Sequence, residues 1–380
     1  MRVLFSCIPS EGHFSPLLPL ARALVARGHE VAFAVAESWR FRPAEEGFDS
    51  FAAGRDARDV HARFEPERRE IFTLPPEQRR PLQFSGLFGR MHAPEKLGEL
   101  LLVARGWAAE AIVFDSADLA APIAAAVLDV PTVNHSFGAM IPFKALERAA
   151  AVVEPLWRQH ALEPDAHAGA FGGLFVDIAP ESFAWERPLG RVVRMRPAPG
   201  AAGTAPAWLD ELGEPLVYVT LGTVWNRAEV FRLLLDGLEG DFSALLTTGR
   251  DVDPASLGPP PPRVRVERFV PQAHVLPRCA AVVSHGGSGT TLAALAHGLP
   301  LVLVPQAADQ FDNAARAEAA GAATVLRPEE LTAEALRAGV ERVLGEPAFE
   351  AAARRIAAEI ERMGTPDEVA AAVEEHVARG

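Results

Sequence analysis

The sequence predicts an α/β protein with two doubly wound parallel sheets, and three features of the chain indicate this. Residues 2–35 read as a buried apolar run, a turn, an amphipathic helix and a second apolar run. The same alternation recurs near 111–133 and several times after residue 206. Between the two series, residues 196–206 are rich in proline, glycine and alanine. Alternating strands and helices form parallel sheets, and this segment divides them into two domains.

The first domain, expected over residues 1–196, opens with a strand at 3–8, because a continuous apolar run is typical of a strand buried on both faces. A helix follows from Leu17, with Pro16 at a favourable first position and Gly28 as its stop. Further strands are expected at 31–35, 111–114 and 131–133, and a second helix at 119–128.

Residues 55–98 show no clean hydrophobic period. They hold a charge-rich piece, RFEPERRE, and an aromatic piece, LQFSGLFGRMH. Long stretches without periodicity are often functional loops or lids. We therefore expect an irregular loop here.

The second domain is expected over residues 207–364, after a linker at 197–206. A last helix at 365–380 could pack on either domain, including back onto the first. In folds of this kind, ligands bind at the carboxyl ends of the strands, and two such domains imply a central cleft. Strands are expected at 216–220, 244–247, 264–269, 281–284 and 301–304, and helices near 228–238, 288–297, 312–320, 332–344 and 348–362.

Composition narrows the class of protein. The chain has 380 residues, 49% of them hydrophobic, a net charge of −13 and two cysteines, Cys7 and Cys279. An acidic chain is a poor partner for nucleic acid, and two distant cysteines imply no disulfide framework or metal site. No run approaches the roughly 20 apolar residues that span a bilayer. We expect a cytoplasmic protein without membrane insertion, and its oligomeric state, a homodimer included, stays open.

Arginine greatly outnumbers lysine, which occurs only at Lys96 and Lys144. We attribute this bias to a GC-rich genome.

The segment SHGGSGTT over 284–291 carries the most chemical information. An apolar strand ends at Ser284, and small residues follow His285 until a helix begins. Small residues allow close approach of the backbone to a ligand, and the unpaired N–H groups of a helix start favour an anion. The segment predicts a phosphate site built without lysine. A glycine-rich turn that only packs the helix on the strand is the alternative.

His13 lies just after the first strand, at the carboxyl edge of the expected sheet. Histidine titrates near neutrality, which suits a base that removes a hydroxyl proton.

These motifs resemble the nucleotide-sugar signature of the GT1-type glycosyltransferases. The similarity rests on ERFVPQ, SHGGSGTT and PQAADQFDN within 267–313, and it extends to VYVTLGT at 217–223 and GHFSPLLPLARALVARGHEV at 12–31. It therefore covers both domains. The pattern is most similar to the bacterial enzymes that glycosylate polyketide and other antibiotic aglycones. The resemblance implies a GT-B fold and a hexosyltransferase-type enzyme dependent on a nucleotide diphosphate sugar.

The resemblance also implies the donor contacts. His285 and the 287–290 turn match the diphosphate cradle, and Asp309 with Gln310 matches the pair that bonds sugar hydroxyls. Phe269 stands where many members have a tryptophan that stacks on the base. The full set of expected donor-binding residues is Gly222, Thr223, Phe269, Val270, Gln272, His285, Gly287, Ser288, Gly289, Thr290, Asp309 and Gln310.

In the family the histidine matched by His13 is the base, and a carboxylate after a later strand orients it, as in a triad. Asp115 is the matching candidate and Asp118 is the second choice. Either carboxylate could instead cap the helix expected from residue 119, and Asp118 fits that cap better.

Apolar and aromatic side chains of the first domain suit a flat hydrophobic acceptor, although they equally suit a core. The candidates lie in the aromatic piece at 84–92 and in NHSFGAMIPF at 134–143: Phe84, Phe88, Met91, Met140 and Phe143.

The expected reaction is an inverting transfer of a deoxyhexose or hexose from a dTDP- or UDP-sugar to a hydroxyl of a small natural-product aglycone. No cofactor and no metal are expected. Asp251 and Asp253 form the D-x-D metal motif of a different glycosyltransferase class, but we interpret them as turn residues. A non-catalytic nucleotide-sugar-binding auxiliary protein is the alternative. A nicotinamide-dependent dehydrogenase lacks its glycine fingerprint after Ile8.

Overall fold

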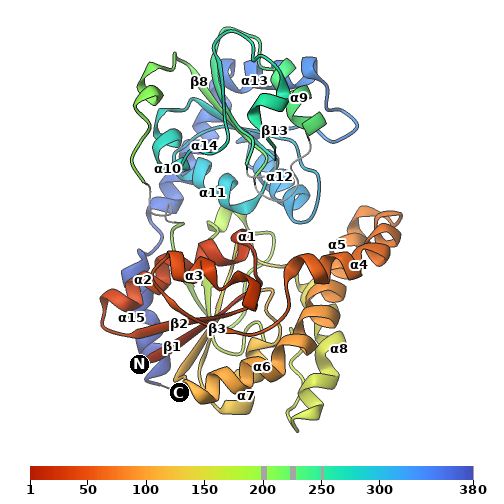
Figure 1. Cartoon of the computed structure of the whole chain (residues 1–380), viewed down its shortest axis with the longest axis vertical. Coiled ribbons are helices and arrows are strands. Elements are labelled where there is room, and N and C mark those ends of the chain that lie inside the picture. The colour runs from red at the N-terminus through yellow and green to blue at the C-terminus, as the bar shows by residue number, and fades with distance from the viewer. Residues whose placement is uncertain (198–202, 223–227, 250–251, 380) are drawn as a thin grey trace. The chain divides into compact units, whose positions relative to one another are not determined.

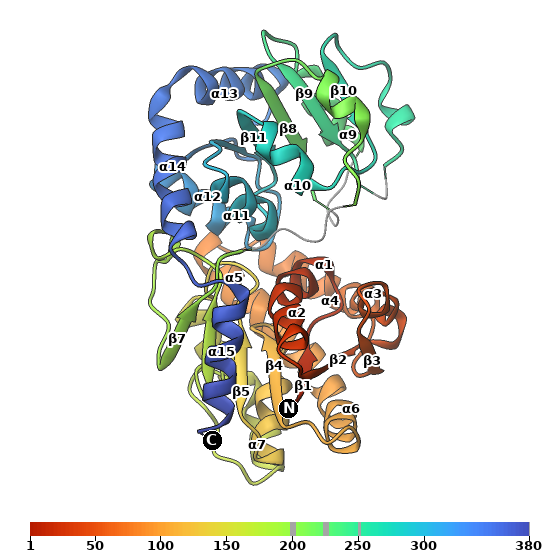
Figure 2. The same ribbon diagram turned by 90° about the vertical axis from the view of Figure 1, so that its left-hand side faces the viewer.

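The computed structural model describes residues 1–197, 203–222, 228–249 and 252–379. The chain divides into two compact units (Figures 1 and 2). The first unit comprises Met1–Ile178, Trp185–Arg196 and Gly364–Gly380, and the second comprises Ala179–Ala184 and Pro197–Met363. Each unit is built on its own parallel sheet.

The sheet of the first unit has seven strands in the order β3-β2-β1-β4-β5-β6-β7. Every neighbouring pair is parallel. The chain enters at β1, winds outward to β3, then returns to β4 on the other side of β1. This reversal between β1 and β4 is the place where doubly wound sheets bind ligands. The strands are β1 (Arg2–Ser6), β2 (Glu30–Val35), β3 (Asp49–Ala52), β4 (Ala111–Asp115), β5 (Thr132–His135), β6 (Leu174–Asp177) and β7 (Arg191–Arg194).

The sequence did not predict β3, β6 and β7. All three are four residues long. β3 and β7 are only partly buried, and the apolar run of β6 is only three residues long, Leu174 to Val176. The N-terminal helix also begins earlier than expected. The chain is helical from Glu11 onward, through α1 (Glu11–Phe14), η1 (Ser15–Leu17) and α2 (Leu18–Ala26).

The irregular loop predicted for residues 55–98 is wrong, because this segment is helical through most of its length. The reason is tertiary packing. Val60, Phe64 and Ile71 form a buried face that dense surface charge and Pro66 conceal in the sequence. Its middle portion, residues 76–92, packs against α8 (Phe143–Gln159). The elements are α4 (Ala57–Phe72), α5 (Pro76–Phe84), a π-helix η3 (Ser85–His92) and α6 (Ala93–Gly106).

The main core of the first unit lies between the sheet and α6, α7 (Ala121–Leu128) and α8. The C-terminal helix α15 (Pro366–Val377) packs against α2, β6 and β7. Arg27, at the end of α2, donates to Glu374 at 2.8 Å and to Asp367 at 3.1 Å. The remaining short elements are η2 (Glu37–Trp39), α3 (Phe41–Glu45) and η4 (Glu181–Phe183), the last in the second unit.

The sheet of the second unit has six parallel strands in the order β10-β9-β8-β11-β12-β13. Its strands are β8 (Leu216–Thr220), β9 (Ser243–Thr247), β10 (Val264–Glu267), β11 (Ala281–Ser284), β12 (Leu301–Leu303) and β13 (Ala323–Val325). Its helices are η5 (Ala207–Glu211), α9 (Ala228–Asp236), η6 (Pro254–Leu257), α10 (Gln272–Val275), η7 (Leu276–Arg278), α11 (Ser288–Ala296), α12 (Gln310–Ala319), α13 (Ala333–Gly345) and α14 (Pro347–Glu361). The short strand β13 was not predicted, whereas the other strands and the longer helices follow the expected segments.

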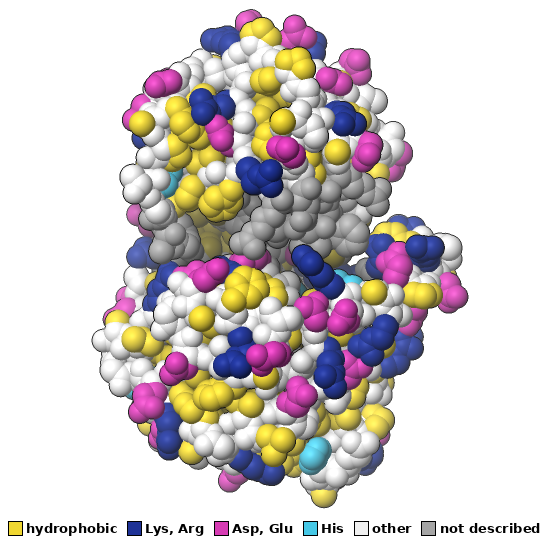
Figure 3. All heavy atoms as spheres, in the orientation of Figure 1, with side chains coloured by type: hydrophobic (Ala, Val, Ile, Leu, Met, Phe, Trp, Pro, Cys, Tyr) yellow, Lys and Arg dark blue, Asp and Glu magenta, His cyan; other side chains and the backbone are white. Residues whose placement is uncertain are grey.

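Two observations bear on partners. Among the described helices, none combines the length and the apolarity that crossing a bilayer demands. On the face drawn in Figure 3, basic and acidic side chains are interspersed over both units.

Candidate active site

The predicted catalytic pair lies in the first unit and is in direct contact. His13 Nδ1 lies 2.9 Å from Asp115 Oδ1, with the Asp115 side chain fully buried and the His13 side chain 14% exposed. A carboxylate only accepts hydrogen bonds, so Nδ1 carries the proton in this contact. The neutral imidazole then leaves Nε2 free to take a proton.

Asp115 is fixed by two more donors. It ends β4, and the backbone N–H of Ile8 donates to its Oδ2 at 2.7 Å. The backbone N–H of Ala117 donates to Oδ1 at 2.8 Å. His13 is carried by α1, immediately after β1, and β1 pairs with β4. Strand order therefore brings together two residues that are far apart in sequence.

Asp118, the second choice for this role, has a different partner. Its Oδ2 lies 2.7 Å from Lys96 Nζ and accepts the Ser6 hydroxyl at 2.6 Å. The suggestion that it caps the following helix is also wrong, because α7 begins at Ala121 with Ala120 in the cap position. Asp118 therefore forms a buried ion pair with Lys96 and does not cap a helix.

Aromatic rings surround the exposed side of the pair. The ring of His13 lies 4.3 Å from that of Phe137 and 5.7 Å from that of Phe88, measured between centroids. Phe88 in turn packs against Phe84 at 5.2 Å and stacks with His92 at 5.9 Å. Phe88 belongs to η3, and π-helical turns occur often at functional sites.

The other acceptor candidates are distributed differently. Phe84 and Met140 are 6% exposed, so both are largely core residues. Met91 is half-buried on η3. Phe143 packs against His167 and Phe171 rather than against the His13 ring. Of the five candidates, Phe88 is the one with a ring contact to His13.

In the second unit, the predicted phosphate turn connects β11 to α11. Gly286 adopts φ +83°, a left-handed conformation that favours glycine, and Gly287 occupies the cap position before Ser288. Within the part of the chain that the structure describes, no side chain caps this helix start. Its first N–H groups are therefore left for a ligand or for water.

The His285 ring sits between two glycines. A Cβ atom added at Gly222 would lie 2.6 Å from His285 Cε1, and one added at Gly287 would lie 2.4 Å from His285 Nε2. The imidazole hydrogen-bonds to the backbone of Thr220, and its Nδ1 is buried with no partner among the described residues. Burial lowers the pKa of His285 to about 4, against smaller raising effects from Asp309 and Thr220. The ring is thus neutral at physiological pH.

A buried network supports the turn from behind. Ser288 Oγ donates to Asp309 Oδ2 at 2.9 Å. Asn313 Nδ2 lies 2.9 Å from Gly286 O, 3.0 Å from Ser288 Oγ and 3.0 Å from Asp309 Oδ2. Asn313 thereby joins the turn to the start of α12. Asn313 was not among the predicted donor-site residues, although it lies within the PQAADQFDN motif.

The remaining donor candidates lie near this turn or beside it in the chain. Gln272 Nε2 donates to Thr290 Oγ1 at 3.1 Å. Gln310 Oε1 accepts from the backbone N–H groups of Gln306 and Ala307, at 2.8 and 3.0 Å. Gly289 is exposed in the first turn of α11.

Phe269 is 74% exposed, while its neighbour Val270 is buried. A free aromatic face of this kind can stack on a planar ligand. Gly222 has φ +74°, and Thr223 lies outside the described residues.

Among the described residues, no group of three or more histidine, cysteine, aspartate or glutamate side chains is arranged to hold a metal ion. Of the D-x-D pair, Asp251 lies outside the described residues, and Asp253 Oδ1 accepts from the backbone N–H of Ala255 at 3.2 Å. That bond is typical of a turn residue.

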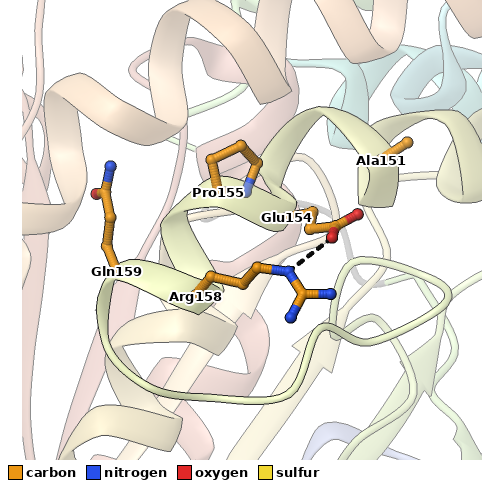
Figure 4. A pocket seen from close by; sticks show the side chains of 5 residues that line it. All are labelled: Ala151, Glu154, Pro155, Arg158 and Gln159. Atoms are coloured by element: carbon orange, nitrogen blue, oxygen red, sulfur yellow. Dashed lines mark hydrogen bonds and ion pairs between the residues drawn. The ribbon is translucent and has the colours of Figure 1, made fainter.

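An open groove of about 520 Å³ lies along α8 and is unrelated to these residues (Figure 4). None of the candidate residues lines it. Its floor includes the Arg158–Glu154 contact of 2.7 Å, an ion pair between adjacent helical turns. The lining residues are Ala151, Glu154, Pro155, Arg158 and Gln159.

Each of the two units has its own parallel sheet, one with a histidine–carboxylate pair and the other with a glycine-rich turn before a helix. This architecture matches the GT-B class of nucleotide-sugar glycosyltransferases. Comparison with family models gives the particular family. Residues 22–222 match the Erythromycin biosynthesis protein CIII-like N-terminal domain, and residues 246–376 match the C-terminal domain of the same name. The chain belongs to the Erythromycin biosynthesis protein CIII-like family. It is a nucleotide-diphosphate-sugar glycosyltransferase, and the predicted family and fold are confirmed.

Individual relatives of the chain are also transferases. The chain is 33% identical to L-demethylnoviosyl transferase of Streptomyces niveus, over 97% of each chain. Its structure is similar to that of the glycosyltransferase VinC in complex with dTDP, with a TM-score of 0.83, 25% identity and 100% of each chain covered. It is equally similar to the spinosyn rhamnosyltransferase SpnG complexed with spinosyn aglycone, with a TM-score of 0.83, 25% identity and coverage of 98% and 100%.

Proposed function

We propose that this enzyme transfers a deoxyhexose or hexose, with inversion, from a dTDP- or UDP-sugar to a hydroxyl group of a small hydrophobic aglycone. The observation that carries the proposal is the contact between His13 Nδ1 and Asp115 Oδ1 at 2.9 Å. It leaves Nε2 as a base beside the aromatic rings of Phe88 and Phe137. The solved relatives with dTDP and with an aglycone support this pairing of ligands.

In the proposed reaction, His13 Nε2 takes the proton of the acceptor hydroxyl as its oxygen attacks the anomeric carbon. The bond between that carbon and the diphosphate oxygen breaks, and the diphosphate leaves with the electron pair. Asp115 holds one tautomer of His13 and stabilises the imidazolium that forms. A single displacement of this kind inverts the configuration of the anomeric carbon.

On the donor side, the N–H groups at the start of α11 would stabilise the negative charge that grows on the leaving diphosphate. His285 contributes a neutral imidazole, which can donate a hydrogen bond without adding charge. Asp309 and Gln310 would bind sugar hydroxyls. Asp309 would accept hydrogen bonds from the sugar through its carboxylate oxygens. Gln310 would donate to the sugar through its NH₂ group, because its oxygen already accepts from two backbone N–H groups.

The test is His13→Ala, assayed with a panel of phenolic and polyketide-type acceptors and dTDP- and UDP-sugars. We expect turnover to fall by roughly 10²- to 10⁴-fold, as for loss of a general base. Affinity for dTDP, measured by calorimetry, should stay unchanged because the donor turn is in the other unit. Full activity in the variant would reject His13 as the base. The anomeric configuration of the product, read by NMR, decides inversion against retention.

A further inference from the structure

Lys96 occupies an unusual place for this chain. Only two of its 37 lysine and arginine residues are lysines. Lys144 is exposed on α8, whereas Lys96 is 3% exposed on α6. A charged side chain is buried this deeply only when it has partners that compensate for the lost water. Composition alone therefore does not explain a lysine at this position.

The ammonium group of Lys96 has a complete set of acceptors. Its Nζ lies 2.7 Å from Asp118 Oδ2, 2.8 Å from the backbone oxygen of Cys7 and 3.3 Å from that of Ala34. Lysine has three N–H donors on one atom, which matches three converging acceptors. The planar fork of arginine cannot direct its donors in this way.

The approach of the side chain is equally specific. A Cβ atom added at Gly54 would lie 3.3 Å from both Cγ and Cδ of Lys96. Gly54 adopts φ +92°, so a larger residue there would also be strained. The lysine stem passes over a glycine to reach the carboxyl ends of β1 and β2.

One peptide group links Lys96 to the catalytic pair. The Cys7–Ile8 peptide accepts from Lys96 through its oxygen and donates to Asp115 Oδ2, at 2.7 Å, through its N–H. Asp115 then accepts from His13 at 2.9 Å. A hydrogen bond at one end of a peptide polarises it and strengthens the bond at the other end. We propose that Lys96 is a positioning residue for the base, acting through the Cys7–Ile8 peptide to hold the Asp115 carboxylate against His13.

The buried charges that surround this peptide support the proposal. Burial raises the pKa of the Cys7 thiol well above its usual value, Asp115 and Asp118 raise it further, and Lys96 opposes them. The Cys7 thiol therefore lies close enough to Asp115, Asp118 and Lys96 for all three charges to affect its pKa. Two other titratable groups interact with His13, namely His61 of α4 and His92 of η3, and Glu11 on its own helix is paired with Arg42. Among the described residues, the side chains that hydrogen-bond to the Cys7–Ile8 peptide are Lys96 and Asp115.

The test measures the NMR titration of the His13 imidazole in the full chain, assigned by the signal missing from His13→Ala. Lys96→Met removes a cation, and we expect the His13 midpoint to rise by about half a pH unit or more. Asp118→Asn removes an anion and should lower it. Lys144→Met, the matched control for loss of a lysine, should leave it unchanged. Midpoints that stay within 0.1 unit (about the error of such titrations) in both folded variants would overturn the coupling.

The midpoints measure the electrostatic coupling of Lys96 and Asp118 to the His13 ring, whereas kcat measures the positioning role. If Lys96→Met does not fold, the neutral double variant Lys96→Met/Asp118→Asn takes its place, because it leaves no unpaired buried charge. In the double variant we expect kcat to fall at least tenfold (about the cost of a misplaced base) while affinity for dTDP is unchanged. A kcat equal to that of the parent would overturn the positioning role.

This inference rests on the proposed role of His13. An active His13→Ala enzyme would defeat that role while the NMR shifts still report whether Lys96 is coupled to the ring. An inactive His13→Ala enzyme with unmoved midpoints would defeat only the assignment of Lys96.

Discussion

The two halves of the candidate site are built in opposite ways. The 285–290 turn of the second unit is local: one strand end, two glycines and a helix start supply its shape within a few consecutive residues. The His13–Asp115 pair of the first unit is assembled from residues 102 positions apart. One support, Ile8, lies in the loop just before His13, and the other, Lys96, comes from a third part of the chain. The proposed anion site is thus encoded in a short motif, whereas the proposed base depends on a tertiary scaffold.

The largest effect should come from Asp115→Asn. An amide can present its NH₂ group to the imidazole and stabilise the wrong tautomer, so we expect turnover to fall by roughly 10²- to 10⁴-fold. Affinity for dTDP should remain that of the parent. Turnover and the calorimetric dTDP affinity, measured on the same variant, test whether the His13–Asp115 pair and the 285–290 turn act independently. A parallel loss of nucleotide affinity would contradict their separation.

A smaller effect is expected from Gly287→Ala in the second unit. The new Cβ would lie 2.4 Å from His285 Nε2, so the ring or the turn must move. We expect dTDP affinity to fall about tenfold or more, in line with the loss of one or two hydrogen bonds. Gly289→Ala is the comparison variant, because its Cβ would meet no atom within 4 Å. Equal losses in the two variants would argue against the packing of His285 as the cause.

A third comparison concerns the stability of the two units toward acid. Burial lowers the pKa of His92 to about 3 and that of His135 to about 4 in the first unit, and that of His285 to about 4 in the second. The unfolded chain takes up these protons first, near pH 6.5. Stability should therefore be complete above that pH and fall as the pH drops toward 4, by roughly 3 kcal/mol for each such histidine at most.

Because the first unit holds two of these three imidazoles, it should open first on acidification. Hydrogen exchange followed by mass spectrometry at pH 7 and pH 5 would measure each unit separately. Earlier opening of the second unit, or an unfolding free energy that does not change between these values, would contradict this account.

Much of the fold was predictable because buried parallel strands leave continuous apolar runs, as in β1, β8 and β11. Helices with dense surface charge were missed. In α4, only Val60, Phe64 and Ile71 are buried, and its remaining surface carries charge that masks the period. The strands β3 and β7 were missed because they are short and only partly buried.

The sequence by itself determined the local chemistry of this enzyme: the small residues of the phosphate turn, the placement of His13 after a strand, and two carboxylates after another. Only the tertiary structure decided which carboxylate meets the histidine. β1 lies beside β4, and this order brings Asp115 to His13 while it turns Asp118 toward Lys96. Asp115 ends β4 and Asp118 follows it three residues later, so their partners depend on which chain segments surround that strand end. Spacing along the sequence does not reveal those neighbours.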